Sequence, residues 1–292
     1  MSDQYHIDKA RVRASFHRAA GSYDAAAILQ QEIRARMLDR LQLVKLAPTR
    51  ILDAGCGTGH ASVALGKRYA GSEVISLDIA LGMLQQTLRH YPLLKRLLGN
   101  KAPAAICADI EQLPLQAGSV DLAWSNVAIQ WCNDLDQAFG EFHRVLRPEG
   151  LLMFSTFGPD TLKELRAASG DGHVHVSRFI DMHDIGDALV RAGFAAPVLD
   201  VERFVLTYDD VMAVMRDLKA IGAHNASAGR PRGLLGRGFL ARLADAYEQF
   251  RDQGKLPATY EVVYGHAWKP AQPRHAHASD TAAVTFHPRK KT

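Results

Sequence analysis

Cysteine is scarce in this sequence, and the few cysteines stand far apart. The 292 residues contain three, Cys56, Cys107 and Cys132, and no two of them form a C-x-x-C pair. An odd and widely spaced set argues against a disulfide framework and against a structural zinc site. We interpret all three as small apolar residues in a reducing compartment.

Long hydrophobic runs are also absent. No stretch approaches the roughly 18 apolar residues that are needed to span a bilayer. The N-terminal segment MSDQYHIDKARVRASF has no apolar core of signal-peptide length. We therefore expect a cytoplasmic protein that does not reside in a membrane.

Neither sign of charge dominates. Lys and Arg total 35 against 31 Asp and Glu, a formal net charge of +4, which suggests only mild attraction to acidic partners. The basic stretches lack the interleaved aromatic residues that stack on bases, so we expect no nucleic-acid partner. The length allows one large domain or two small ones, and the 47% hydrophobic content is ordinary for a globular protein.

The first 47 residues and the segment that follows them have different periodicities. Apolar positions at helical spacing over residues 8–46 predict two helices that are broken near Gly21, with Ser22 or Asp24 as the N-cap of the second. From residue 50, short apolar runs alternate with helical stretches. The strand candidates are RILDAG, EVISLDIA, AAICADI, VDLAWSN and GLLMFSTFG. This alternation predicts an α/β fold with a parallel sheet that is covered on both faces.

The C-terminal third adds strands and helices to this core. PVLDVERFVLTY and TYEVVYGHAW read as strands, and two helices, 209–222 and 238–251, lie between them. The boundaries that we predict are 1–47 for the N-terminal helices, 48–207 for the α/β core, 208–257 for a helical insertion, 258–270 for the last strand and 271–292 for a disordered tail.

A glycine-rich loop follows the first predicted strand. In ILDAGCGTGH, Gly55, Gly57 and Gly59 stand at every second position. Glycine costs conformational entropy there, so a tight turn or a ligand close to the backbone is the usual reason. A strand that leads through such a loop into a helix is typical of a nucleotide-cofactor site.

Three acidic residues follow predicted strands in order. Asp53 begins the loop, Asp78 lies 19 positions past Gly59, and Asp109 ends the third strand candidate. A dinucleotide would use the acid on the ribose but offers no role for Asp109. S-adenosylmethionine (SAM) has no phosphate and can use acids at its ribose, adenine and ammonium group. The acidic set therefore favours SAM.

ILDAGCGTG, SLDIALGML, CADIEQLPL, VDLAWSN and RVLRPEGLLMFSTFG together resemble the class I SAM-dependent methyltransferases over residues 45–160. The resemblance implies a seven-stranded sheet with one antiparallel strand. Together with Asp53, the residues that we assign to the cofactor are Gly55, Gly57, Gly59, Asp78, Asp109, Ile110 and Asn126. The resemblance implies that the glycines line the methionine part, that Asp78 binds the ribose, that Asp109 and Ile110 contact the adenine, and that Asn126 lies beside the amino-acid part.

The segments outside the shared core resemble one particular family of these methyltransferases. RASFHRAAGSYDAAAILQQEIRARML, SNVAIQWCND, DLKAIGAHNA and TYEVVYGHAW are similar to the malonyl-acyl carrier protein O-methyltransferase family of bacterial biotin synthesis, over residues 11–268. Membership would imply methylation of the free malonyl carboxylate by SAM, with S-adenosyl-L-homocysteine as the second product and no metal. The methyl ester masks the charge, so that fatty-acid synthesis can extend the primer toward pimeloyl.

This chemistry needs orientation more than acid–base catalysis. A carboxylate with a pKa near 4 is already ionised at neutral pH, so no general base is required. Alignment of the reactants and exclusion of water are what such a site must supply, and the 208–257 insertion could act as a lid. Tyr23 or Arg144 could orient the carboxylate, and the resemblance favours Tyr23 because it implies that the N-terminal helices, residues 1–47, cover the SAM pocket. Tyr23 could instead attach its helix to the core, Arg144 could be a structural ion-pair partner, and Trp131 could either wall the acyl pocket or pack in the core.

An acyl carrier protein is acidic beside its prosthetic arm, so a partner needs exposed bases. One basic stretch carries Lys9, Arg11, Arg13 and Arg18. A second surrounds a glycine-rich loop, and we assign carrier binding to Arg230, Arg232 and Arg237 there. A solvated basic surface without a partner is the alternative. We expect a monomer.

Two other functions remain open. The same SAM core could methylate a small carboxylic acid or a quinone-like ring, or it could bind SAM without catalysis. Proteins of the last kind often lose the loop glycines or the ribose acid, and this sequence keeps both. The sequence leaves open whether malonyl-coenzyme A also serves, and what the tail does.

Overall fold

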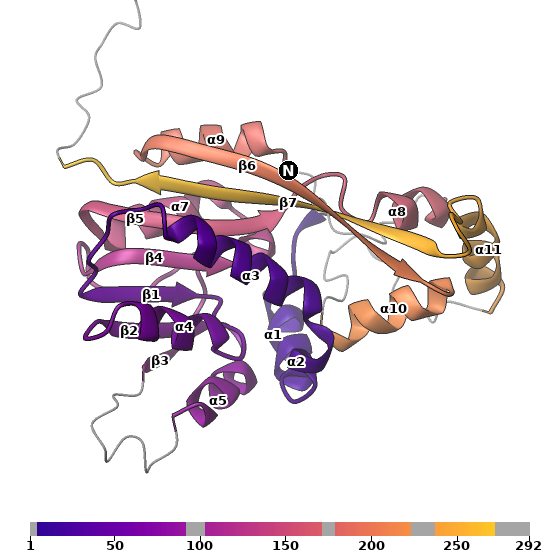
Figure 1. Cartoon of the computed structure of the whole chain (residues 1–292), viewed down its shortest axis with the longest axis horizontal. Coiled ribbons are helices and arrows are strands. Elements are labelled where there is room, and N and C mark those ends of the chain that lie inside the picture. The colour runs from indigo at the N-terminus through magenta and orange to yellow at the C-terminus, as the bar shows by residue number, and fades with distance from the viewer. Residues whose placement is uncertain (1–4, 92–102, 171–178, 223–236, 272–292) are drawn as a thin grey trace, which may run out of the picture.

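The computed structural model describes residues 5–91, 103–170, 179–222 and 237–271 (Figure 1). Its centre is one seven-stranded sheet in the order β3-β2-β1-β4-β5-β7-β6. The strands are β1 (Arg50–Ala54), β2 (Glu73–Asp78), β3 (Ala104–Cys107), β4 (Val120–Asn126), β5 (Leu146–Phe157), β6 (Ala195–Tyr208) and β7 (Leu256–Trp268). The pairs among β1 to β5 are parallel, whereas β7 runs antiparallel to both β5 and β6. The predicted α/β class and the single antiparallel strand are confirmed.

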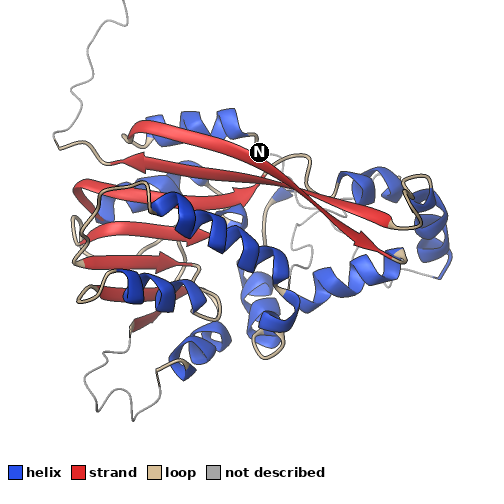
Figure 2. Cartoon of the chain, viewed as in Figure 1, coloured by secondary structure: helices blue, strands red, loops and turns tan. Residues whose placement is uncertain are grey.

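Helices cover both faces of this sheet (Figure 2). Successive side chains of β1 show why: Ile51 belongs to one hydrophobic core and Leu52 to the other, as expected for a strand buried on both faces. The first core includes α3 (Ile28–Leu41) and α4 (His60–Arg68). The second includes α7 (Leu135–Val145) and α9 (Met182–Arg191).

The N-terminal segment forms three helices where two are predicted. These are α1 (Lys9–Ala19), α2 (Tyr23–Ala26) and α3, and the additional break lies at Ala27, whose φ of −83° and ψ of 42° leave the helical region. Ser22 is the N-cap residue of α2, as predicted, but neither predicted side chain makes a capping hydrogen bond. Ser22 donates instead to the carbonyl of Ala19, while Asp24 accepts from the hydroxyl of Thr58.

The C-terminal insertion extends the molecule beyond the sheet. Strands β6 and β7 continue past the other strands, and α8 (Lys163–Ser169), α10 (Val211–Ala220) and α11 (Arg237–Glu248) gather around their far end (Figure 1). The two helices predicted here are confirmed, with bounds that differ by up to three residues. Beyond α10, Gly222 lies against Phe16 and Ala19 of α1. The insertion therefore contacts the N-terminal helices.

Two of the residues predicted to bind the carrier protein, Arg230 and Arg232, lie outside the described residues, as does the tail from residue 272. Arg237 is the first residue of α11. Among the described helices, none is both long enough and apolar enough to cross a bilayer.

Candidate active site

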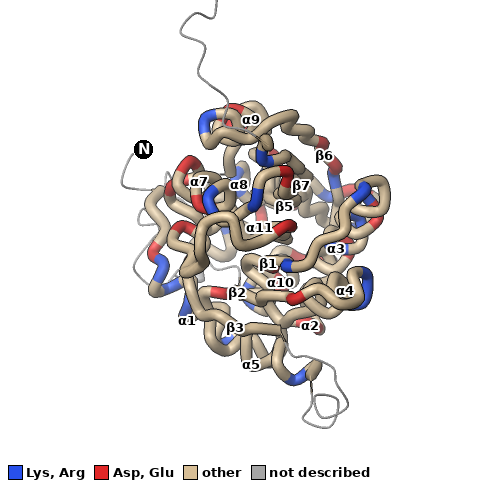
Figure 3. Tube along the Cα trace, turned by 90° about the vertical axis from the view of Figure 1, so that its left-hand side faces the viewer, with Lys and Arg blue, Asp and Glu red and all other residues tan. Residues whose placement is uncertain are grey.

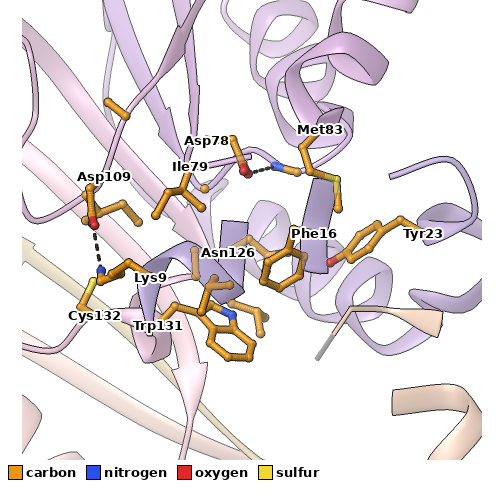
Figure 4. Close-up of a pocket in the computed structure, with 17 residues that line it drawn as sticks. Lys9, Phe16, Tyr23, Asp78, Ile79, Met83, Asp109, Asn126, Trp131 and Cys132 are labelled. Atoms are coloured by element: carbon orange, nitrogen blue, oxygen red, sulfur yellow. Dashed lines mark hydrogen bonds and ion pairs between the residues drawn. The ribbon is translucent and has the colours of Figure 1, made fainter. Parts of the chain in front are cut away.

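A cavity opens at the carboxyl ends of β1, β2 and β4, where ligands bind in open α/β sheets (Figure 4). Helix α1 closes it from one side with Val12 and Phe16, and α2 contributes Tyr23. The predicted site residues that line this cavity are Tyr23, Gly55, Gly57, Asp78, Asp109, Ile110 and Asn126, together with Trp131. Asp53, Gly59 and Arg144 do not line it.

The three loop glycines are needed for different reasons. All have positive φ angles, +72°, +55° and +87° for Gly55, Gly57 and Gly59. A Cβ at Gly55 would lie 2.2 Å from the Cβ of Ala128, and one at Gly59 would lie 2.5 Å from Thr87. A Cβ at Gly57 would meet no protein atom within 4 Å. The backbone at Gly57 thus borders open space in the cavity, while the other two glycines permit close packing around it.

Asp78 joins the glycine loop to the end of β2. Its Oδ2 accepts a hydrogen bond from the backbone N–H of Gly57 at 2.9 Å, and its Oδ1 accepts one from the N–H of Ala80 at 2.8 Å. Burial raises the pKa of this carboxyl to about 6, against the lowering effect of the two N–H donors. The carboxylate keeps lone pairs on both oxygens for a ligand hydroxyl.

Asp53 lies behind the loop and not on the cavity wall. It is 1% exposed, and its Oδ2 accepts from the hydroxyl of Ser62 at 2.5 Å. Its Oδ1 has no hydrogen-bond partner within the described part of the chain. Burial raises the pKa of Asp53 to about 7. Direct contact with the cofactor is therefore not supported for Asp53, whose bond to Ser62 ties β1 to α4, the two elements that the glycine loop connects.

Asp109 is paired with a cation. The Nζ of Lys9 lies 3.0 Å from Asp109 Oδ1, and it also contacts Glu111 Oε2 (Figure 4). Glu111 in turn accepts from the backbone N–H groups of Asn133 and Asp134. The start of α1 is thereby attached to the segment after β3. Lys9 is thus part of the cavity wall and unavailable as the exposed docking base that the basic stretch suggested.

Asn126 ends β4 with both ends of its amide engaged. Its Nδ2 donates to the carbonyl of Gln30 at 3.2 Å, and its Oδ1 accepts from the hydroxyl of Ser155 at 3.0 Å. The next residue, Val127, has a φ of +51°, which is rare for a β-branched side chain. Its N–H donates to both the carbonyl and the hydroxyl oxygen of Ser155. These bonds hold the strained turn that carries Ala128 to the glycine loop.

Three aromatic side chains form one wall of the cavity. Phe16 makes edge contacts with Tyr23, at 6.5 Å between ring centroids, and with Trp131, at 5.4 Å (Figure 4). Trp131 ends a short 3-10 helix, η2 (Ile129–Trp131). The hydroxyl of Tyr23 makes no hydrogen bond within the described part of the chain, and burial raises the pKa of this phenol, so the group is a neutral donor. Tyr23 thus brings an unpartnered O–H to an otherwise apolar wall.

Arg144 has a different environment from the one that a substrate-orienting role requires. Its guanidinium forms two hydrogen bonds with Glu141 and two more with the carbonyls of Leu113 and Leu115. Pairing with Glu141 raises the pKa of Arg144 further. The two bonds to Glu141 lie within α7, and the two bonds to the carbonyls tie α7 to the segment before β4. We therefore correct the predicted catalytic role of Arg144: its contacts fit the structural alternative.

The sequence interpretation placed the N-terminal helices over the pocket, but it did not identify which α1 residues line the cavity, and it missed the contribution of α5. Lys9, Phe16 and Met83, the last from α5 (Leu81–Arg89), line it. The helical spacing of Lys9, Val12 and Phe16 could have indicated one shared face, but it does not say what that face contacts. Within the described residues, no three His, Cys, Asp or Glu side chains are grouped so as to hold a metal ion.

Solved structures share this fold at low sequence identity. Geranyl diphosphate C-methyltransferase from Streptomyces coelicolor has 16% identity and a TM-score of 0.50, with 82% of this chain and 79% of that chain covered. The [4+2]-cyclase SpnF has 20% identity and a TM-score of 0.51, with 82% of each chain covered. The family described as methyltransferase domain matches residues 52–154. Sheet order and family match define a class I SAM-dependent methyltransferase fold.

Curated proteins are similar over nearly the whole chain. A malonyl-[acyl-carrier protein] O-methyltransferase from Methylovorus sp. is 71% identical over 290 residues, which cover 99% of this chain and 98% of the relative. One of the same name from Laribacter hongkongensis is 58% identical and covers 99% of both chains. The chain belongs to the malonyl-[acyl-carrier protein] O-methyltransferase family.

Proposed function

We propose that this protein transfers the methyl group of SAM to the free carboxylate of malonyl that is carried as a thioester on acyl carrier protein. The observation that carries this proposal is the extent of the likeness. Identity of 71% runs over 290 residues, including α1, α2 and the insertion as well as the 52–154 core. The methyl ester then has no charge at its far end, which suits it to prime pimeloyl synthesis for biotin.

The cavity fits SAM. Gly57 leaves its backbone exposed to the ligand, and Asp78 offers both carboxylate oxygens to the ribose hydroxyls. We assign Asp109 and Ile110 to the adenine end of the ligand. The Asp109 carboxylate pairs with the Lys9 ammonium in this structure, and the amino group of adenine could donate to the same carboxylate. Gly55 and Asn126 lie at the methionine end, and Gly59 and Asp53 support the loop from behind. When bound, SAM supplies a sulfonium methyl and becomes S-adenosyl-L-homocysteine.

Tyr23 is the residue that we assign to the acceptor carboxylate. Its free hydroxyl can donate one hydrogen bond to a carboxylate oxygen, which leaves the second oxygen for the new bond to the methyl carbon. The carboxylate is ionised at neutral pH, so no proton has to be removed. The chain supplies alignment, and the rings of Phe16 and Trp131 exclude water around the attacking oxygen.

The carrier protein is the partner that this substrate requires. The basic, glycine-rich segment of the sequence that contains Arg230 and Arg232, together with Arg237, is a candidate contact because complementary charge speeds and orients docking. We propose no metal for the reaction, because a carboxylate oxygen and a sulfonium methyl need neither activation nor a Lewis acid.

Mass spectrometry tests the function directly. The purified protein is incubated with SAM and malonyl-acyl carrier protein, with free malonate, malonyl-coenzyme A and trans-aconitate as parallel substrates. We expect one added methylene on the carrier-bound malonyl group, removable by mild base as an ester is. Methylation of a small acid without the carrier would favour the small-acid enzyme. Binding of SAM without any transfer would favour a binding protein.

A further inference from the structure

Helix α1 has two chemically different faces. Its inner face lines the cavity with Lys9, Val12 and Phe16. Arg11, Arg13 and Arg18 are exposed on the remaining surface of the helix. No acidic residue occurs between Asp8 and Asp24, so the charged residues of α1 are all Lys or Arg. Figure 3 marks the positions of Lys and Arg along the trace.

These three arginines have no ion-pair partner among the residues that the structure describes. The acids that border them are occupied. Asp8 caps α1 by accepting from the backbone N–H of Arg11, and Asp24 lies at the far end of the turn, where it accepts from Thr58 and contacts His60 at 3.1 Å. The positive charge of α1 is thus left uncompensated. This contrasts with α3, where Arg36 and Arg40 pair with acids of α3 and β6.

Helix α1 is held in place beside the cavity, so a partner that binds the exposed surface of α1 is close to the cavity. Ile7 exchanges two hydrogen bonds with Asn133, and His17 accepts from the N–H of Gly82, so both ends of α1 are attached around the cavity. The end of α10, which carries the exposed cations Arg216 and Lys219, leads into Gly222 against Ser15 and Ala19. A partner on this face would lie beside the helix that forms the cavity wall.

We infer that the outer surface of α1, which carries Arg11 and Arg18 on one side and Arg13 on the other, is a docking surface for the acidic acyl carrier protein. This inference rests on the proposed function. A carrier must place its acyl arm in the cavity, so it must dock beside the cavity, and an unpaired basic helix at that place complements an acidic partner. Charged contacts between exposed side chains mainly raise the association rate, and they weaken as the salt concentration rises.

Charge reversal on the helix tests the inference. We compare wild type with Arg11→Glu/Arg18→Glu and with the neutral pair Arg11→Gln/Arg18→Gln, using malonyl-acyl carrier protein as the varied substrate. The control is Lys67→Glu, which removes an exposed base from the last turn of α4, just as Arg18 lies in the last turn of α1. SAM affinity by calorimetry and the melting temperature show whether each variant keeps its fold and cofactor site.

We expect KM for the carrier substrate to rise about tenfold or more in the Glu pair and less in the Gln pair, with kcat and SAM affinity nearly unchanged. The dependence of kcat/KM on ionic strength should flatten in the same order. An unchanged KM in the folded Glu pair, or an equal rise in Lys67→Glu, would overturn the docking surface while leaving the methyltransferase activity established. Absence of carrier methylation by wild type would instead overturn the proposed function itself.

Discussion

At the scale of single residues, the polar side chains of the cavity differ in how much of their bonding capacity is used. The amide of Asn126 is bonded at both ends, and the carboxylate of Asp78 holds two backbone N–H groups. The hydroxyl of Tyr23 has no such partner in the described part of the chain. A donor that is free before substrate binds can form a hydrogen bond to the substrate without first breaking a hydrogen bond within the protein.

Replacement of Tyr23 by Phe tests this role. A hydrogen bond to a charged group contributes about 1.5–3 kcal/mol, so kcat/KM for malonyl-acyl carrier protein should fall about 10- to 100-fold. SAM affinity and melting temperature should stay near those of wild type, because the ring and its contact with Phe16 remain. Tyr69→Phe removes another unpartnered hydroxyl away from the cavity and should leave activity unchanged. Equal activity of Tyr23→Phe and wild type would refute the assignment.

Asp53 makes stability depend on pH. Its pKa is about 7 in the folded protein, whereas an unfolded aspartate titrates near 3.8. Between these values the folded state retains a proton that the unfolded state has lost, so this group makes the protein less stable as pH rises from about 4 to 7. The Asp53→Asn variant has no ionisable carboxyl group at this position, so it lacks this contribution to the pH dependence of stability.

Melting temperatures of wild type and Asp53→Asn over this pH window check that sign. The wild-type value minus the variant value should decrease as pH rises toward 7 and level off above it. Asp187→Asn, which replaces an exposed carboxyl of α9, serves as the control. Parallel curves for wild type and Asp53→Asn would contradict the expected coupling.

At the scale of elements, different glycines of the loop serve packing and ligand binding. Gly55 allows the loop to touch Ala128, whereas Gly57 faces open space. Substitution by Ala should therefore lower mainly the stability at Gly55 and mainly the affinity for SAM at Gly57. Gly55→Ala adds a clash to the left-handed strain and should lower the free energy of unfolding by about 3 kcal/mol in total.

Gly57→Ala should lose only about 1–2 kcal/mol of stability from its positive φ. Its methyl group would press on the ligand, which corresponds to a SAM Kd about tenfold higher. Gly118→Ala is the matched control, because Gly118 has a φ of +61° and no atom within 4 Å of its added Cβ. Denaturant unfolding and SAM calorimetry on the three variants check both effects. Wild-type SAM affinity in Gly57→Ala would contradict the assignment of the loop.

At the scale of the whole molecule, the cavity is closed by segments far apart in the sequence. Residues 9–23 of α1 and α2 face strand ends and loops from residue 55 to residue 132. The insertion reaches the same helices through Gly222. Because α1 and α2 cover the cavity from outside the sheet, a bound ligand should order them more than it orders the sheet.

Addition of S-adenosyl-L-homocysteine tests this coupling. A ligand at one hundred times its Kd stabilises the folded state by about 2.7 kcal/mol, which corresponds to roughly 5 °C in melting temperature. Hydrogen exchange should slow most in α1 and α2, with α9, which contributes no residue to the cavity wall, as the internal reference. Uniform protection of both regions, or no protection, would show that α1 and α2 do not close over the ligand.

The sequence by itself determined the class of fold and the residues at the strand ends that border the cavity. Strand and helix periods are local, and parallel strands end at one edge of a sheet, so the residues after β1, β2 and β3 had to meet there. Gly55, Gly57, Asp78 and Asp109 were predictable for that reason, Asn126 was implied by the family resemblance, and all five line the cavity.

Only the tertiary structure decided how the remaining groups are used. Arg144 binds carbonyls about thirty residues earlier in the chain, and Lys9 pairs with Asp109 one hundred residues later. Gly59 turned out to face Thr87, and Asp53 to face Ser62, away from the cavity. Such contacts join segments whose separation in sequence bears no relation to their separation in space, so no periodicity or spacing along the chain encodes them.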